Sequence, residues 1–94
     1  MSMSEEAAET LALKALAWLA ADQELMGVFM GATGAAVEDL RNRAADRAFL
    51  GSVLDFLTMD DAWVMRFCDE TGQDYALPMT ARAVLAGEAQ THWT

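Results

Sequence analysis

The sequence contains one cysteine, one proline and one histidine, and each scarcity excludes a class of structure or chemistry. A single cysteine, Cys68, excludes an intramolecular disulfide, a Cys-x-x-Cys redox pair and a zinc site of several thiolates. A catalytic pair of Cys68 with His92 would need a third orienting group, and a histidine two residues from the end of the chain is poorly placed to hold it. We therefore expect no catalytic residues and interpret Cys68 as a structural cysteine, buried or half-buried.

Basic residues are also scarce, because six lysines and arginines face fifteen acids and give a net charge of −9. Such a surface repels phosphate backbones and anionic membranes, so we expect no nucleic-acid partner and no membrane partner. The longest apolar stretch, Leu11 to Ala21, is interrupted by Lys14 and is too short to span a bilayer. The acidic N-terminal segment does not resemble a secretory signal, and we expect a cytoplasmic protein.

Two motifs that resemble ligand sites do not meet the requirements of their chemistry. The acid-rich stretch from Asp69 to Thr80 has no glycine at its sixth position and lacks the ligand pattern of a calcium-binding EF-hand loop. The glycines Gly27, Gly31 and Gly34 match neither a phosphate-binding loop nor a dinucleotide-binding turn. We therefore predict no metal and no cofactor.

The chain does contain an internal similarity at a spacing of 38 positions, which needs no insertion or deletion. The first copy has Leu16, Trp18, Leu19, Asp22, Phe29, Thr33 and Gly34, and the second has Leu54, Phe56, Leu57, Asp60, Phe67, Thr71 and Gly72. Six of these seven pairs are identical, and the seventh exchanges one aromatic residue for another. The pattern predicts two copies of a small helical unit that bury their faces against each other.

Alanine, leucine, methionine, glutamate and arginine favour helix through most of the chain. Six helices are predicted, at about 5–20, 22–32, 36–44, 47–57, 60–71 and 76–86. Aspartates begin several of them, glycines end two, and we expect the four aromatic residues of the repeat to hold each unit together. The predicted fold is all-α: a single domain, 1–94, forming a compact orthogonal bundle of two three-helix units, about 5–44 and 46–86, with a flexible tail at 87–94.

The two copies differ at Gly27 and Gly31, whose counterparts are Met65 and Asp69. Two glycines in one helix are destabilising, so we expect another part of the chain to pack closely there; a docking groove or dimer contact is the alternative. The methionines inside the domain are interpreted mainly as core filler, with Met30 and Met59 as the exceptions expected to be exposed. With two arginines near the joint between the copies, the candidate interaction surface comprises Gly27, Met30, Gly31, Met59, Arg41 and Arg43.

The sequence resembles a small family of proteins of unknown function from alphaproteobacteria. The resemblance covers about residues 10–86 and is carried by Trp18, Leu19, Asp22, Leu25, Phe29, Thr33 and Gly34; by Asp46, Phe49, Leu50, Val53 to Leu57 and Asp60; by Phe67, Cys68 and Gly72; and by Ala81, Arg82, Ala83 and Leu85. It implies an all-helical cytoplasmic bacterial domain and supplies no catalytic residue, cofactor or partner.

These observations favour a non-enzymatic protein-interaction module that binds a peptide or helix in an apolar groove. The alternative is a homo-oligomeric structural protein in which a second copy covers the same face. A small-molecule-binding protein or an enzyme is less favoured, because the chain offers few polar groups that would converge in a cleft.

Overall fold

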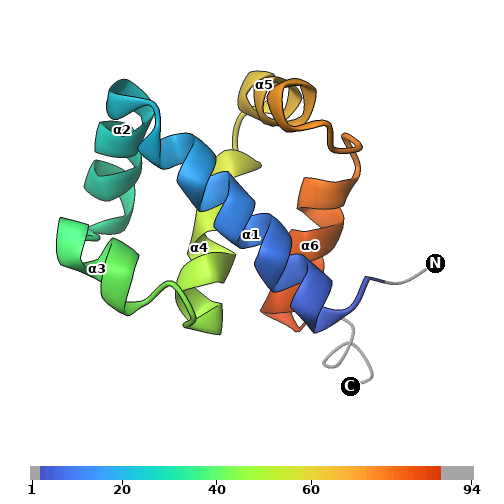
Figure 1. Ribbon diagram of the computed structural model, residues 1–94, viewed down its shortest axis with the longest axis horizontal. Coiled ribbons are helices and arrows are strands. Elements are labelled where there is room, and N and C mark those ends of the chain that lie inside the picture. The colour runs from blue at the N-terminus through green and yellow to red at the C-terminus, as the bar shows by residue number, and fades with distance from the viewer. Residues whose placement is uncertain (1–2, 88–94) are drawn as a thin grey trace.

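The computed structural model describes residues 3–87, and within this range the chain forms six α-helices and no strand (Figure 1). The helices are α1 (Glu5–Ala20), α2 (Gln23–Thr33), α3 (Val37–Asn42), α4 (Arg47–Leu57), α5 (Asp61–Thr71) and α6 (Leu77–Ala86). Their bounds lie close to those predicted, with α3 shorter than expected. The predicted flexibility of the tail falls on residues that lie almost entirely outside the described range.

Short polar side chains begin four of the helices. Asp22 accepts hydrogen bonds from the amides of Glu24 and Leu25 at 3.1 Å, and Asp60 accepts one from Ala62 at 2.8 Å. Ser4 and Asp46 cap α1 and α4 in the same way. These contacts satisfy amides that have no partner inside the helix, and they confirm the predicted aspartate caps.

Glycines end α2 and α5 in the left-handed backbone conformation. Gly34 has φ of 75° and Gly72 has φ of 74°, and each donates its amide to a carbonyl of the preceding turn. The threonine before each glycine donates its hydroxyl to the carbonyl four residues earlier, that of Phe29 or Phe67. A residue with a Cβ is strained in this conformation, which is why glycine stands there. The prediction that these two glycines end helices is confirmed.

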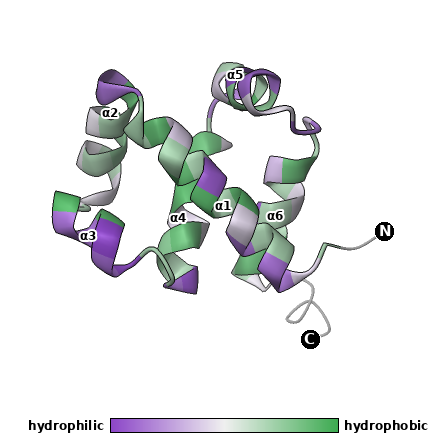
Figure 2. Ribbon diagram, viewed as in Figure 1, coloured by the Kyte–Doolittle hydropathy of each residue, from purple (hydrophilic) through white to green (hydrophobic). Residues whose placement is uncertain are grey.

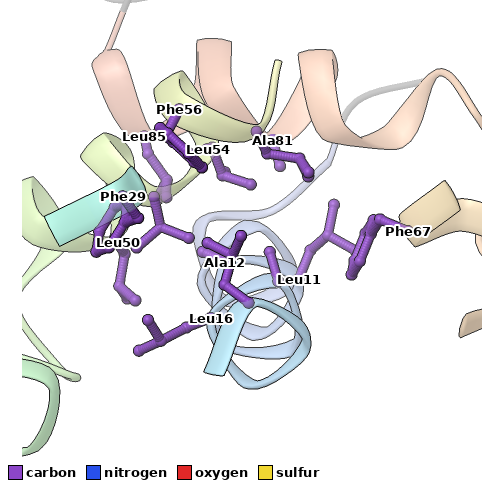
Figure 3. Packing of buried hydrophobic residues seen from close by; sticks show 14 of the residues in the cluster. Leu11, Ala12, Leu16, Phe29, Leu50, Leu54, Phe56, Phe67, Ala81 and Leu85 are labelled. Carbon is purple, nitrogen blue, oxygen red and sulfur yellow. The ribbon is translucent and has the colours of Figure 1, made fainter. Parts of the chain in front are cut away.

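The core lies where α1, α4 and α6 pack on one another, with α2 added against α1 and α4. Figure 3 shows side chains of α1, α4 and α6 meeting, with Phe29 of α2 and Phe67 of α5 on opposite sides. The helix α3 contributes no buried residue, and its polar residues stand out in Figure 2. The buried hydrophobic residues are Ala8, Leu11, Ala12, Ala15, Leu16, Leu19, Leu25, Met26, Phe29, Phe49, Leu50, Val53, Leu54, Phe56, Leu57, Phe67, Cys68, Ala81 and Leu85.

The aromatic residues join the two predicted units to each other. Trp18 packs edge-on against Phe67 with ring centroids 5.7 Å apart, and Phe29 packs edge-on against Phe56 at 5.4 Å. Phe29 also contacts Phe49 of α4. The expectation that these rings hold each unit together is met in the second predicted unit, where Phe56 stacks on Trp63 of α5 with ring centroids 4.7 Å apart. It is wrong for Trp18 and Phe29, whose rings pack against α5 and α4 of the other predicted unit.

Arg47 ties together the ends of three helices. From the first turn of α4, its guanidinium donates to the carbonyls of Val84 and Leu85 at the end of α6, at 2.9 and 3.2 Å. It also pairs with Glu5 of α1 at 2.8 Å. A cation at the end of α6 bonds the Leu85 carbonyl, adds a second donor to the Val84 carbonyl, which also accepts from the Gly87 amide, and opposes the negative end of the helix dipole.

Candidate functional site

The predicted glycine face of α2 is open. Gly27 and Gly31 are exposed, and a Cβ atom added at either position would meet no atom of the described residues within 4 Å. The expectation that another part of the chain packs closely on these glycines is therefore wrong. The alternative, a docking or dimer contact on this face, stays a prediction.

The two methionines of the predicted surface differ in exposure. Met30 is half-buried against the core, whereas Met59, in the turn between α4 and α5, is exposed over 75% of its area. The exposure expected for both residues is thus found in full only for Met59.

The two arginines of the predicted surface lie at the end of α3. Arg43 pairs with Asp46 at 3.1 Å, and its guanidinium lies 5.2 Å from the ring centre of Phe49. The hydrogen bond from the Ala48 amide lowers the pKa of Asp46 most, and the pairing with Arg43 lowers it further. Arg41 lies exposed in the last turn of α3, where a cation complements the helix dipole. Local pairing therefore accounts for Arg43.

The most apolar of the hollows that we describe lies elsewhere, between α5 and the start of α6. Its volume is about 310 Å³, and we call it the methionine groove; its lining residues are Thr58, Asp61, Val64, Met65, Tyr75 and Met79. Three of them are large hydrophobic residues left exposed: Met65 over 51% of its area, Tyr75 over 52% and Met79 over 53%. The interpretation of methionines as core filler is therefore wrong for Met65 and Met79, and only Met26 is fully buried filler.

Helix geometry explains how α5 presents this surface. Asp61, Met65 and Asp69 follow one another at intervals of four residues and so share one side of the helix. Tyr75, in the connection to α6, donates its hydroxyl to the Asp69 carboxylate. This hydrogen bond and the negative charge of Asp69 raise the pKa of Tyr75, so the hydroxyl stays protonated at neutral pH.

Cys68 lies behind this surface and faces the core. It is buried, as expected for a structural cysteine, and its Sγ lies 3.5 Å from the carbonyl oxygen of Asp74. Burial raises the pKa of its thiol, and the charges of Asp69 and Asp74 act in the same direction. A protonated, covered thiol is a poor nucleophile, which argues against thiol chemistry at this position.

The charges around the methionine groove are unevenly compensated. Arg66 of α5 is directed away from it and pairs with Asp22 at 3.5 Å. Arg82 of α6 pairs with Asp55 at 2.6 Å. Among residues 3–87, neither Asp61 nor Asp69 has a salt-bridge partner, so the edge that α5 contributes to the groove is negative.

A second hollow, of about 610 Å³, lies between the α1–α2 turn and α5, and four of its polar side chains are bonded in two pairs. The indole of Trp18 donates to Glu70 at 2.7 Å, and the Arg66 guanidinium lies 5.5 Å from the Trp18 ring centre. Asp22 is engaged both as the cap of α2 and as the partner of Arg66. These bonds fasten α5 to α1, and they leave few groups directed at a ligand.

A third hollow, of about 210 Å³, lies between α4 and α6 around the Asp55–Arg82 pair. None of the three hollows is lined by the six residues of the predicted surface. Figure 1 shows α2 and α3 on one side of the molecule and α5 and α6 on the other. Five of the six residues belong to α2 and the end of α3, and Met59 lies in the turn before α5, so a shared surface for the six stays a prediction.

A signal in the sequence did point to the methionine groove. Met65, Tyr75 and Met79 stand 38 positions after Gly27, Val37 and Arg41, so the groove is the counterpart of the glycine face of α2 and α3. Gly27 and Gly31 predict a binding surface on the first predicted copy, whereas the hollow lies on the second. The exposure of Met65 and Met79 does not follow from their spacing, because burial depends on where neighbouring helices lie.

The described part of the chain offers no group of three histidine, cysteine or acidic residues placed to hold a metal ion. None of its helices is long and apolar enough to cross a membrane.

No curated protein and no solved structure matches the chain. One family matches over residues 5–88, which is most of the sequence. The chain accordingly belongs to the family described as "Protein of unknown function (DUF3572)".

Proposed function

We propose that the protein is a non-enzymatic interaction module that binds a helix or peptide of another protein in the methionine groove. The observation that carries this proposal is the hollow between α5 and α6, where Met65, Tyr75 and Met79 are each about half exposed. Apolar side chains gathered around a hollow gain free energy when a partner covers them.

Methionine suits this role because its side chain is unbranched and flexible. Met65 and Met79 approach the groove from different helices and can adjust to side chains of different shapes. Met59, in the turn that precedes α5, adds a further exposed thioether next to the groove residue Thr58. The surface is adaptable, while Val64 at its base is packed against the core.

The net charge opposes the homo-oligomeric alternative. Each chain carries a charge of −9, so two copies meeting at an acidic face repel each other. A partner with basic residues meets no such cost. We therefore favour a different protein over a second copy.

We also propose that the chain consists of two similar units and that the protein is bacterial and cytoplasmic. At the spacing of 38 positions, Trp18 corresponds to Phe56 and Phe29 corresponds to Phe67. The contact of Trp18 with Phe67 therefore has an equivalent contact of Phe56 with Phe29, and the interplanar angles of the two ring pairs are 73° and 75°. This agreement supports two similar units related by an approximate twofold axis. The resemblance to alphaproteobacterial proteins supports a bacterial, cytoplasmic setting.

Nuclear magnetic resonance of methionine ε-methyl groups tests the groove directly. The probe is a neutral amphipathic helical peptide with a leucine stripe and glutamine on its polar face. We expect it to shift the signals of Met65 and Met79 and to leave that of buried Met26 unchanged. The double variant Met65→Gln, Met79→Gln should fold normally, because both side chains are exposed, and should bind the peptide about tenfold more weakly.

Three other outcomes would overturn the proposal. Shifts confined to Met30, with binding lost in Gly31→Arg, would assign the site to the α2 face. Shifts of Met65 and Met79 that grow with protein concentration in the absence of peptide would assign the groove to a second copy. The absence of any shift would remove the groove as a binding site.

A further inference from the structure

We infer that the occupant of the methionine groove is a basic amphipathic helix, with lysines or arginines on both sides of its apolar stripe. This inference rests on the proposed function and adds the chemistry of the partner. It comes from the order of charged and apolar side chains along α5 and from the directions taken by the neighbouring arginines.

The edge of α5 places one acid on each side of the groove methionine. Asp61 stands one helical turn before Met65, and Asp69 stands one turn after it. At 1.5 Å per residue, the two carboxylates project from points about 12 Å apart along the helix axis. Two cations about two turns apart on a partner helix would match this spacing, with an apolar residue between them.

The negative charge of this edge is not neutralised from within the described chain. Between positions 58 and 79 there are five acids and one base. That base, Arg66, lies against Trp18 and Asp22 on another side of α5. The hydrogen bond from Tyr75 to Asp69 comes from a hydroxyl and brings no positive charge to this edge. A cationic partner therefore gains Coulomb energy here, and an anionic one is repelled.

The backbone around the groove favours a helical partner over an extended one. An extended peptide that adds to the edge of a sheet gains main-chain hydrogen bonds from its receptor. The groove lies between two helices, and residues 3–87 contain no strand that could offer such an edge. A partner helix satisfies its own backbone and can bury one apolar face between α5 and α6.

The experiment compares three helical peptides that share one leucine stripe and carry lysine, glutamine or glutamate beside it. Fluorescence anisotropy of labelled peptide gives the dissociation constant with the full chain at low and high salt. We expect the lysine peptide to bind about tenfold more tightly than the glutamate peptide at low salt, and the difference to shrink as salt rises.

A matched pair of variants separates the local effect from that of net charge. The double variant Asp61→Asn, Asp69→Asn should reduce the preference for lysine about fivefold. The control, Glu6→Gln with Glu38→Gln, removes the same charge from exposed first-turn acids of α1 and α3 and should leave the preference unchanged. Urea unfolding of both double variants checks that each of them folds.

The possible results distinguish this inference from the proposed function. Equal binding of all three peptides, abolished by Met65→Gln with Met79→Gln, would overturn the inference and leave the groove in place. A lysine preference that survives in Asp61→Asn, Asp69→Asn would also overturn it. If none of the peptides binds, both the inference and the proposed function fail.

Discussion

Replacing the exposed glycines of α2 by alanine should stabilise the protein. Gly27 and Gly31 lie within a helix, and an added Cβ would meet no atom within 4 Å. Alanine at such a position restricts the unfolded chain and costs nothing in the folded one, so each substitution should add about 0.5–1 kcal/mol to the free energy of unfolding. The double variant should gain about 1–2 kcal/mol, provided that the effects add.

The matched control is glycine in the left-handed conformation. Gly34 and Gly72 also have open space around them, but their φ values of 75° and 74° are unfavourable for alanine. Gly34→Ala and Gly72→Ala should each lower stability by about 1–2 kcal/mol. Replacing glycine by alanine is thus expected to raise the free energy of unfolding at Gly27 and Gly31 and to lower it at Gly34 and Gly72, because the backbone conformation differs.

Urea unfolding followed by circular dichroism measures these changes, with thermal unfolding as a second assay. A gain of 1 kcal/mol should raise the midpoint temperature of a domain of this size by about 4–8 °C. A loss of stability in Gly27→Ala or Gly31→Ala would refute the reasoning, because it would mean that something contacts this face in solution. Repeating the measurement at several protein concentrations would show whether that contact is a second copy.

The remaining predictions concern the core, the caps, the arginine tie and the thiol. Phe67→Ala should cost about 3–5 kcal/mol, because it removes a fully buried ring that contacts Trp18; a urea midpoint unchanged by this substitution would contradict its place in the core. Asp60→Ala should cost about 1 kcal/mol through the lost cap of α5, and Asp60→Asn should restore most of it in the same assay. Arg47→Ala should cost about 1–2 kcal/mol, because it removes two hydrogen bonds to carbonyls at the end of α6 and the ion pair with Glu5, whereas Arg41→Ala should be nearly neutral; equal effects would refute the tie. Cys68 should react with a thiol reagent only as fast as the protein opens, and rapid labelling of the folded chain would contradict its burial. The folded thiol keeps its proton above its ordinary pKa of 9.0, while the unfolded thiol ionises there, so stability should fall as the pH rises from 9.0 towards the raised pKa.

The start and end of most helices could be predicted from the sequence because each depends on a few adjacent residues. Asp22 and Asp60 accept bonds from amides two or three positions away, and Gly34 and Gly72 end helices through their own backbone conformation. These interactions are complete within one or two turns. They are the same whatever the rest of the chain does.

The candidate site could be predicted only in part. The sequence indicated Met59 as exposed and marked Met65 and Asp69 as different from their counterparts in the first copy. It did not show which copy carries the hollow. A methionine at helical spacing fits a core or a surface equally well, and its burial is decided by helices that are distant in the sequence.

The sequence by itself determined the helical class, the positions of the caps and stops, and the acidic character of the surface. Only the tertiary structure decided that Phe29 packs on Phe56 and Phe67 on Trp18, that the glycines of α2 face open space, and that Met65 and Met79 border a groove. The physical reason is the distance along the sequence over which each interaction acts. Caps and turns are local hydrogen bonds, whereas burial follows from how α1, α4 and α6 pack together, and that packing leaves one side of α5 uncovered.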